Sequence, residues 1–493
     1  MNHFRLKTAS FDFGVGSIAS IEFVAAPTGS QSRQTHFTLL MGANGSYKSR
    51  ALAGCVDLLR HQNSLISDEK PESPSECCRY ATIELDGRTS EIGAEPLFQS
   101  GNKFLPSRVL ALSNLVRDKF TFGERDEENN PNRFYHYLGV RQATNLTTTG
   151  AMDRIVADAF LEVLPDTERR ELLFKWIGKL FANYELAFGF ANLRRKSFDD
   201  FLQDPNAFFA KLRGIARPTP SARALEEIPG YRGQIESLQP YIERWLNQKE
   251  RVVSSSGSQR SQVVTGPLNQ LSEKECSEIA RLRPAFEAAR RLRLLSGPYM
   301  LLRKKGKQPS PWLKLTNLSS GEQNLISTGA RLVAHAKPGC FIAIDEPELS
   351  LNVAWQQRYI ELINSALASA KGSHVMIASH SPHLVSSLES GNSTVVVAEM
   401  NGDSVQYSTH DGSFFGWGAE AILYKVLDIP SASNFEFTRE LSAILLHIQN
   451  GGKNRDLLDE FLRKADKIEL RKGDDALAAL IAEIESYRKG LEA

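Results

Sequence analysis

The segment HFTLLMGANGSYKS, residues 36–49, decides the fold because it combines an apolar run, a glycine-containing turn and the beginning of a helix. The apolar run predicts a buried strand, and SRALAGCVDLLRHQ (residues 49–62) has the spacing of a helix. In this setting the N–H groups of the turn and the helix N-terminus can hold the β- and γ-phosphates of a nucleotide. We therefore expect a phosphate-binding loop whose nucleotide contacts come from Gly42, Asn44, Gly45, Ser46, Lys48, Ser49 and Arg50.

Two side chains give this loop its chemistry. Lys48 would neutralise the phosphates, and the Ser49 hydroxyl would bind Mg²⁺. Tyr47 breaks the usual pattern, because glycine normally precedes the lysine and lets the backbone approach the phosphate closely. We therefore expect slow hydrolysis or altered binding. Taken alone, the segment could also be a chance Gly-Asn-Gly turn before a basic residue.

A second motif, CFIAIDEPE (residues 340–348), is an apolar strand that ends in two adjacent carboxylates. Phosphoryl transfer to water needs one carboxylate to hold the Mg²⁺ shell and another to orient the attacking water. Asp345 suits the first role and Glu346 the second. On its own, such a strand end is more often an ordinary exposed turn.

Two further motifs follow the same logic. LSSGEQ (residues 318–323) opens a helix whose free N–H groups suit an anion, although Ser and Gly also occur there for capping alone. HVMIASHSPHL (residues 374–384) is a buried strand followed by His380, which can hydrogen-bond a γ-phosphate or the attacking water. A lone histidine at a strand end would usually be structural.

The order of the four motifs resembles that of the ABC-type ATPases. The resemblance implies an α/β fold with a mixed sheet, a split nucleotide-binding domain, a helical insertion, and ATP and Mg²⁺ as ligands. It implies catalytic roles for Lys48, Glu346 and His380. In that family two nucleotide domains pack head to tail, so the signature residues would act in trans on the partner's nucleotide; here they are Ser319, Ser320, Gly321 and Glu322. A glutamine after a first-lobe strand normally completes the metal site, and Gln142 is the candidate here.

Further segments resemble the soluble branch of that family, which contains RecF, SMC-like proteins and OLD-type ATPases. They are EPELSLNVAWQ (residues 346–356), in which Asn352 replaces the usual histidine, and SHSPHL. VLALSNLVRDKF and FYHYLGVR resemble the first lobe of ATPases from prokaryotic anti-phage defence systems, notably the PtuA subunit of Septu and of some retrons. That resemblance implies a separate partner nuclease of the HNH type, since we find no Toprim nuclease pattern after His380.

Length and composition set the frame for these motifs. The 493 residues are 41% apolar and 24% charged, and the net charge of +1 excludes a bulk polycation that coats nucleic acid. No apolar run approaches the roughly 18–20 residues of a membrane helix, and the five cysteines lack CxxC spacing, so we expect a cytoplasmic protein. We divide the chain into a first ATPase lobe (1–150), a helical insertion (151–296), a second ATPase lobe (297–434) and a helical tail (435–493).

One local charge bias remains. Between Arg281 and Lys307 there are nine basic residues and a single acid, Glu287. Such a cluster could hold DNA or RNA phosphates, although a solvated helix face followed by a hairpin tip is the simpler interpretation. Three functions stay open: an ATPase that regulates a partner nuclease, a DNA-repair ATPase of the SMC–RecF kind that acts directly on DNA, and a non-hydrolysing ATP-dependent scaffold.

Overall fold

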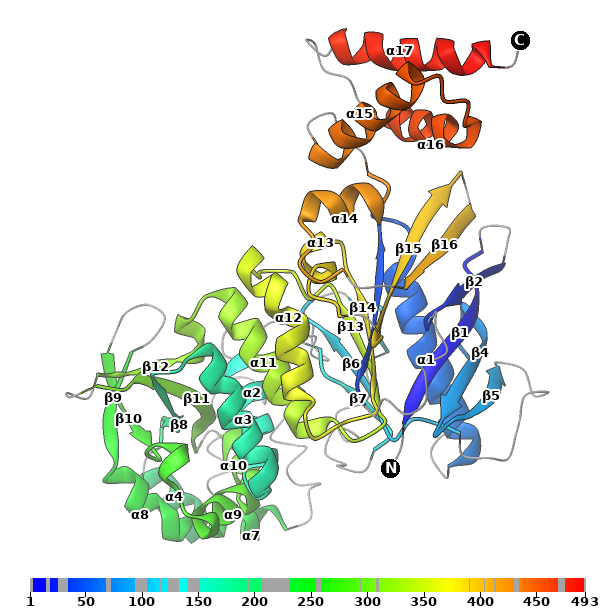
Figure 1. Cartoon of the computed structure of the whole chain (residues 1–493). Coiled ribbons are helices and arrows are strands. Elements are labelled where there is room, and N and C mark those ends of the chain that lie inside the picture. Colours follow the sequence, from blue (N-terminus) through cyan, green and yellow to red (C-terminus); the bar gives the residue numbers. More distant parts are fainter. Residues whose placement is uncertain are drawn as a thin grey trace.

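The protein is described by a computed structural model (Figure 1). The described residues are 3–14, 18–24, 34–67, 72–93, 104–115, 118–121, 133–139, 151–193, 195–204, 207, 230–253, 259–292, 294–306, 310–389, 391–402, 404–411, 414–429, 434–468 and 475–491. Within these ranges no helix is long and apolar enough to span a membrane.

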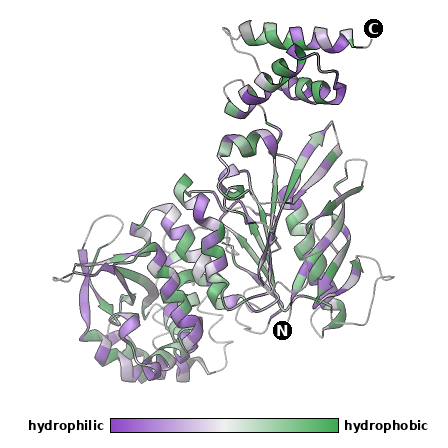
Figure 2. Cartoon of the chain, in the orientation of Figure 1, coloured by the Kyte–Doolittle hydropathy of each residue, from purple (hydrophilic) through white to green (hydrophobic). Residues whose placement is uncertain are grey.

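A seven-stranded mixed sheet forms the centre of the molecule. Its order is β16 (Ser404–Asp411), β15 (Ser393–Asn401), β3 (His36–Gly42), β14 (His374–Ala378), β13 (Phe341–Asp345), β6 (Val109–Ser113) and β7 (Tyr135–Tyr137). All neighbours are parallel except the β15–β16 hairpin. The central strands are mainly apolar because parallel strands are covered on both faces, as the green strands of Figure 2 show. Strands from both ends of the chain are neighbours in this one sheet, so the expected α/β fold with a mixed sheet built from two separate parts of the chain is confirmed.

One face of this sheet is covered by α1 (Lys48–Ile66) and a second, antiparallel sheet. The second sheet has the order β2 (Ile18–Glu22), β1 (Phe4–Asp12), β4 (Cys78–Leu85) and β5 (Arg88–Gly93). Leu52, Val56 and Leu59 of α1 share one buried core with Phe11 and Met376. This packing fixes the helix that begins at the phosphate loop.

The opposite face is covered by α11 (Ser320–His335), α12 (Val353–Ala366), α2 (Ala151–Val163) and α3 (Thr167–Leu180), all of which lie on the other side of the sheet from α1 in Figure 1. Trp176 of α3 packs directly against Gly329 of α11, where a Cβ atom would overlap the indole ring. Its Nε1 donates to the Leu362 carbonyl oxygen at 2.9 Å, which fixes the ring between α11 and α12.

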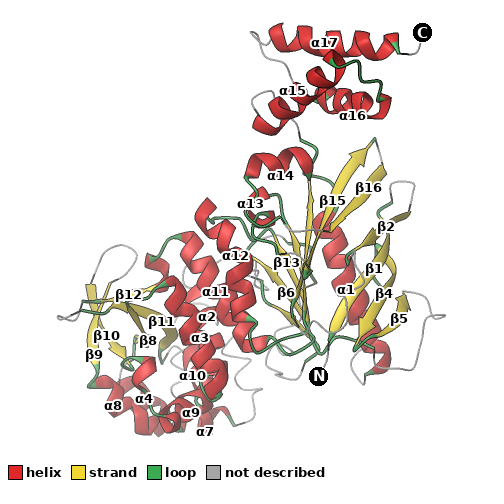
Figure 3. Cartoon of the chain, viewed as in Figure 1, coloured by secondary structure: helices red, strands yellow, loops and turns green. Residues whose placement is uncertain are grey.

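The middle of the chain differs from the helical insertion that we expected at residues 151–296. It contains a closed five-stranded barrel of order β10 (Gln259–Val264), β8 (Tyr184–Ala191), β11 (Ser296–Lys304), β12 (Trp312–Lys314) and β9 (Lys249–Val253). Figure 3 shows this barrel beside α4 (Arg195–Gln203), α7 (Tyr231–Glu236), α8 (Gln239–Leu246), α9 (Glu273–Arg281) and α10 (Arg283–Arg291). Short 3₁₀ turns lie at Leu268–Gln270 and Leu315–Asn317.

The barrel also moves the boundary that we placed at residue 297. β11 and β12 close the barrel by pairing with β8 and β9, and they do not join the ATPase sheet. The sequence hides these strands because β9 and β10 are short and mostly polar, and only Val252, Val264, Leu301, Trp312 and a few others form the barrel core. The inserted unit therefore extends to the turn before α11.

After His380 the chain forms α13 (Pro382–Val385), the β15–β16 hairpin and α14 (Ala419–Lys425), and then a unit of three helices. These are α15 (Phe435–Gln449), α16 (Arg455–Asp466) and α17 (Asp475–Gly490). They have a core of their own, in which Phe437 of α15 stacks on Phe461 of α16 with ring centroids 5.4 Å apart. In Figure 1 this unit projects beyond α14, away from the barrel.

Candidate nucleotide-binding site

The chemically active residues meet at one edge of the central sheet. The phosphate loop follows β3, His380 follows β14, and Asp345 ends β13. These three strands are neighbours, since Ala378 of β14 pairs with Leu40 on one side and with Asp345 on the other. Carboxyl ends of adjacent parallel strands lie side by side, and such an edge is the usual ligand site of an open α/β sheet.

The phosphate loop is closed around its own lysine. Lys48 Nζ donates to the carbonyl oxygens of Gly42 at 3.0 Å and Ala43 at 2.9 Å, and the side chain is buried. Burial lowers the pKa of Lys48, whereas the nearby carboxylates of Glu346 and Asp345 act in the opposite direction. Gly42, at φ 143°, is required here because a Cβ atom would overlap the carbonyl oxygen of Ala398.

Tyr47 occupies the position where glycine was expected, and its backbone adopts the conformation that glycine favours. It is the N-cap of α1 with φ 61°. Its ring stacks on Phe13, and the Arg50 guanidinium lies 5.3 Å from the Tyr47 ring centroid. Aromatic stacking and the cation–π contact thus offset part of the cost of a left-handed tyrosine.

Ser49 and Asp345, the two predicted metal ligands that lie within the described residues, are in direct contact. Ser49 Oγ donates to Asp345 Oδ1 at 2.7 Å, and Asp345 is 2% exposed. Burial raises the pKa of Asp345 to about 6, and the hydrogen bond from Ser49 partly opposes this rise. A hydroxyl beside a carboxylate fits Mg²⁺, which takes one or two protein oxygens and keeps several waters. Gln142 lies outside the described residues, and in the described ranges no group of three His, Cys, Asp or Glu side chains is arranged to hold a metal.

Glu346 and His380 form the next layer of the site. His380 Nε2 lies 3.1 Å from Glu346 Oε1, and both side chains are partly exposed. Glu346 has φ 48°, and its N–H donates to the Ala378 carbonyl oxygen at 2.9 Å, which ties the turn after β13 to β14. Burial raises the pKa of Glu346, but the His380 and Glu348 hydrogen bonds outweigh it, so the pKa is lowered and the carboxylate is ionised at neutral pH.

Glu348 also belongs to this site, although the sequence analysis gave it no role. Its Oε1 accepts a hydrogen bond from the backbone N–H of His380 at 2.6 Å. Burial raises the pKa of Glu348, and the neighbouring Glu346 carboxylate raises it further. The sequence Glu346-Pro347-Glu348 carried the signal, because the two glutamates flank one proline and both contact His380.

The signature residues lie at the N-terminus of α11. Ser319 caps the helix through a capping box with Glu322, whose carboxylate accepts from Ser319 N at 2.8 Å. Ser319 and Ser320 are exposed, and Gly321 packs against the Ser350 carbonyl oxygen, which a Cβ atom would approach to 2.6 Å. Because α11 and α1 cover opposite faces of the sheet, these residues form a second surface, separate from the phosphate loop (Figure 1).

Two asparagines that the sequence analysis did not single out connect this surface to the catalytic strands. Asn324 of α11 donates to the Leu349 carbonyl oxygen at 3.1 Å, in the loop after Glu348. Asn114, just past β6, donates to Asn324 Oδ1 at 2.6 Å. The signature helix is therefore bonded to the segments that follow β6 and β13. Neither residue has a local sequence signal, since each contact spans a long stretch of chain.

The basic cluster of residues 281–307 is divided between α9, α10 and β11, and three of its arginines form ion pairs. Arg283 contacts Glu162 at 2.5 Å, and Arg291 contacts Glu287 at 2.5 Å. Arg303 bonds Glu185 at 3.0 Å and Glu250 at 2.8 Å. Arg293 and Lys307 lie outside the described residues. Arg283, Arg291 and Arg303 therefore contribute to the packing of the inserted unit through their ion pairs.

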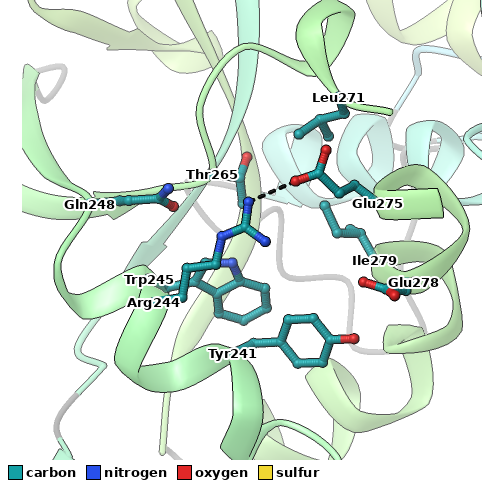
Figure 4. Close-up of a pocket in the computed structure, with 9 residues that line it drawn as sticks. All are labelled: Tyr241, Arg244, Trp245, Gln248, Thr265, Leu271, Glu275, Glu278 and Ile279. Carbon is teal, nitrogen blue, oxygen red and sulfur yellow. Dashed lines mark hydrogen bonds and ion pairs between the residues drawn. The ribbon is translucent and has the colours of Figure 1, made fainter. Parts of the chain in front are cut away.

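A small pocket lies in the inserted unit, among α8, α9 and the end of β10 (Figure 4). Trp245 and Tyr241 line it, and Arg244 bonds Glu275 at 2.7 Å across it. None of the nucleotide-site residues lines this pocket.

Comparison with known proteins finds a family match for part of the chain. Residues 167–386 match the family model described as "AAA domain, putative AbiEii toxin, Type IV TA system"; the range includes α11, Asp345, Glu346 and His380. No curated protein sequence matches the chain. The match covers less than half of the chain and does not include the phosphate loop.

Several solved structures are similar in part. The Smc head domain of Pyrococcus furiosus, bound to the C-terminal domain of ScpA, is 14% identical over 83% of this chain and 97% of that chain, with a TM-score of 0.29. The SMC head domain from Thermotoga maritima is 12% identical over 83% of this chain and 100% of that chain, with a TM-score of 0.27. An ATP-binding cassette of an ABC transporter in its ADP conformation is 11% identical over 86% of this chain and 96% of that chain, with a TM-score of 0.30.

Proposed function

We propose that this chain binds and hydrolyses Mg²⁺–ATP at the edge formed by β3, β14 and β13, as one half of a head-to-tail dimer, and that its nucleotide state controls a partner nuclease of the HNH type in anti-phage defence. The observation that carries the ATPase proposal is the hydrogen bond of 2.7 Å between Ser49 and Asp345. It joins the helix that begins at the phosphate loop to the strand that ends in the Asp-Glu pair.

Each residue at the edge has a distinct role. The loop N–H groups and Lys48 bind the phosphates, and Ser49 and Asp345 hold the metal. Mg²⁺, when bound, neutralises charge on the β- and γ-phosphate oxygens. Glu346 is ionised and accepts a proton from the attacking water, while His380, 3.1 Å away, holds this carboxylate in position and can donate to the γ-phosphate.

The trans arrangement is supported by the exposure of the signature turn. Ser319 and Ser320 are exposed at the N-terminus of α11, and Leu349 and Val353 nearby are 41% and 49% exposed. An exposed helix N-terminus beside apolar side chains suits contact with the phosphates and surface of a second copy of the chain.

The proposed partner nuclease is supported by features outside the nucleotide site. Its support is the matched family, whose description names a putative toxin of a toxin–antitoxin system, and the likeness of residues 109–120 and 134–141 to defence ATPases. The three-helix unit α15–α17 offers a surface outside the ATPase sheet, with Phe435 68% and Leu446 57% exposed.

Two variants test the ATPase. Lys48→Ala is expected to abolish nucleotide binding, measured with a fluorescent ATP analogue, whereas Lys371→Ala, an exposed lysine at the opposite end of β14, is the matched control. Glu346→Gln should still bind ATP but hydrolyse it about 100-fold more slowly, and it should accumulate an ATP-bound dimer in light scattering. Wild-type binding and turnover in both variants would refute the proposal.

The dimer can be tested by mixing two inactive variants. Lys48→Ala removes the phosphate site, and Ser320→Glu places a charge on the signature turn. If the signature acts in trans, an equimolar mixture contains one intact composite site in each heterodimer and regains about a quarter of the wild-type rate. If it acts in cis, the mixture stays inactive.

Tyr47 supports a second candidate, a scaffold that binds ATP without turning it over. Its ring is packed and its side chain partly buried at the loop where close approach of the backbone to phosphate is needed. Tight nucleotide binding with turnover at background in the wild type would favour the scaffold over the ATPase.

A further inference from the structure

Glu348 is bonded to the backbone of the histidine that faces the catalytic carboxylate. Its Oε1 accepts from His380 N at 2.6 Å, while the imidazole of the same residue lies 3.1 Å from Glu346. The two glutamates flank Pro347 on one turn, so one of them fixes the main chain of His380 and the other meets its ring.

The amide of His380 needs this acceptor because it lies just past the sheet. The preceding amide, Ser379 N, still donates to the Leu40 carbonyl oxygen of β3 at 3.0 Å. One residue later the ladder has ended, and the structure gives the His380 amide a carboxylate oxygen as its acceptor. A short bond to a carboxyl group restrains a backbone amide more strongly than a bond to water.

The residues on either side of His380 keep bonds that do not involve Glu348. Ser379 N donates to the Leu40 carbonyl oxygen, and Ser381 Oγ donates to Gln356 Oε1 at 2.6 Å. Glu348 also hydrogen-bonds the Ser379 side chain, whose Oγ accepts from Ser381 N at 2.9 Å. Loss of the Glu348 carboxyl group should therefore release the His380 amide, while the Ser379 N–H and Ser381 Oγ bonds hold β14 and α13 in place. This separation makes a specific positioning role testable.

We propose that Glu348 is a positioning residue for ATP hydrolysis: its carboxyl oxygen fixes the backbone of His380 and thereby holds the imidazole at hydrogen-bond distance from Glu346. The inference rests on the proposed ATPase function of the site. Glu348 has no assigned contact with nucleotide or metal. Its side chain also hydrogen-bonds Glu346, so it acts through the positions of His380 and Glu346. Misplacement of the imidazole lowers the rate of the chemical step, and nucleotide binding, which depends on the phosphate loop, is retained.

Two substitutions of similar size distinguish the acceptor from the side-chain volume. Glu348→Gln keeps an oxygen that can accept from His380 N, and Glu348→Met removes it while filling the space. We expect kcat of Glu348→Met to fall about tenfold or more with the ATP dissociation constant unchanged, and Glu348→Gln to stay within about threefold of the wild type. Equal rates in the two variants would overturn the inference.

Hydrogen–deuterium exchange of the peptide that contains His380 gives a readout that does not depend on turnover. Faster exchange in Glu348→Met but not in Glu348→Gln supports the anchor, and identical exchange in both overturns it. If the wild type binds ATP but does not hydrolyse it, the proposed ATPase function fails, and the exchange measurement alone decides the anchor. Thermal unfolding of both variants confirms that each is folded.

Discussion

The rings of Tyr47 and Phe13 stack with centroids 4.8 Å apart and planes within 12° of parallel, while the Tyr47 backbone has φ 61°. Phe13 follows β1 and Tyr47 precedes α1, so this contact joins the antiparallel sheet to the phosphate loop. Tyr47 has the left-handed backbone conformation that glycine normally adopts at this position of a phosphate loop. The stacking with Phe13 offsets part of the strain that this conformation causes in a tyrosine.

Substitutions at Tyr47 should separate strain from stacking. Tyr47→Ala loses the ring contact but keeps the unfavourable φ, whereas Tyr47→Gly loses the contact and removes the strain. We therefore expect Tyr47→Gly to be more stable than Tyr47→Ala by about 1 kcal/mol in urea unfolding. If the tyrosine limits turnover, Tyr47→Gly should also hydrolyse ATP faster than the wild type. Equal stability of the two variants would show that the loop changes conformation without the ring.

Asp153 predicts a specific pH dependence of stability. Burial raises its pKa to about 6, although Lys314 and the Thr316 backbone oppose the rise, and Oδ1 is a buried atom with no partner among the described residues. The folded state therefore holds a proton that the unfolded state releases near its ordinary value of about 4. Protonated Asp153 therefore stabilises the folded state at low pH, and this contribution is lost as the pH rises through about 6.

Asp153→Asn should remove that dependence. A pKa shift of about two units corresponds to about 3 kcal/mol at most. Between pH 4.5 and pH 7.5 the free energy of unfolding of the variant should therefore rise relative to that of the wild type by an amount of that order. Guanidinium unfolding at both pH values measures the difference. A constant difference between variant and wild type across the range would place the pKa of Asp153 near its ordinary value.

The parts of the fold that the sequence predicted are those with a local pattern. β3, β13 and β14 are short, mainly apolar runs, and the chemically active residues lie at or shortly after their carboxyl ends, so sheet geometry brings those residues together without further information. The barrel has no such pattern, since most side chains of β9 and β10 are not buried. These two strands pair with each other, but they close the barrel only by pairing with β12 and β8, which are distant in sequence.

The role of Glu348 shows a second kind of limit. The sequence shows a glutamate at this position, but its proposed role depends on the backbone amide of His380, which is 32 positions away in sequence. Asn114 and Asn324 are similar, because their contact joins the end of β6 to α11 across 210 positions of sequence. Sequence reasoning finds donors and acceptors that follow a strand; it does not find those that act on main-chain atoms of another strand.

Gly321 should be intolerant of a side chain. A Cβ atom there would come within 2.6 Å of the Ser350 carbonyl oxygen, so Gly321→Ala forces the first turn of α11 away from the loop after β13. We expect a loss of about 1–3 kcal/mol of stability and a loss of the ATP-bound dimer formed by Glu346→Gln. Gly178→Ala in α3 is the matched control, because its Cβ atom meets nothing within 4 Å and it should gain about 0.5–1 kcal/mol. Equal behaviour of the two variants would contradict the packing.

Arg303 should contribute to the fold of the barrel and not to nucleic-acid binding. Its guanidinium bonds Glu185 and Glu250 and lies 4.2 Å from the Trp312 ring centroid, so Arg303→Met leaves two partly buried carboxylates without their partner. We expect a loss of about 2–4 kcal/mol in urea unfolding. Lys304 and Lys305 are exposed, so Lys304→Glu with Lys305→Glu should leave stability nearly unchanged.

The double lysine variant then tests whether the basic cluster binds nucleic acid directly. Each lysine that neutralises a phosphate adds about one unit to the salt dependence of binding, so a DNA-binding cluster would lose about two units of slope in Lys304→Glu/Lys305→Glu. Three arginines of the cluster are already bound to carboxylates, and we therefore expect DNA affinity and its salt slope to be the same in wild type and variant. A drop in slope, measured by fluorescence anisotropy between 50 and about 200 mM salt, would favour an ATPase that acts directly on DNA, since ATP turnover should be unaffected by these two lysines.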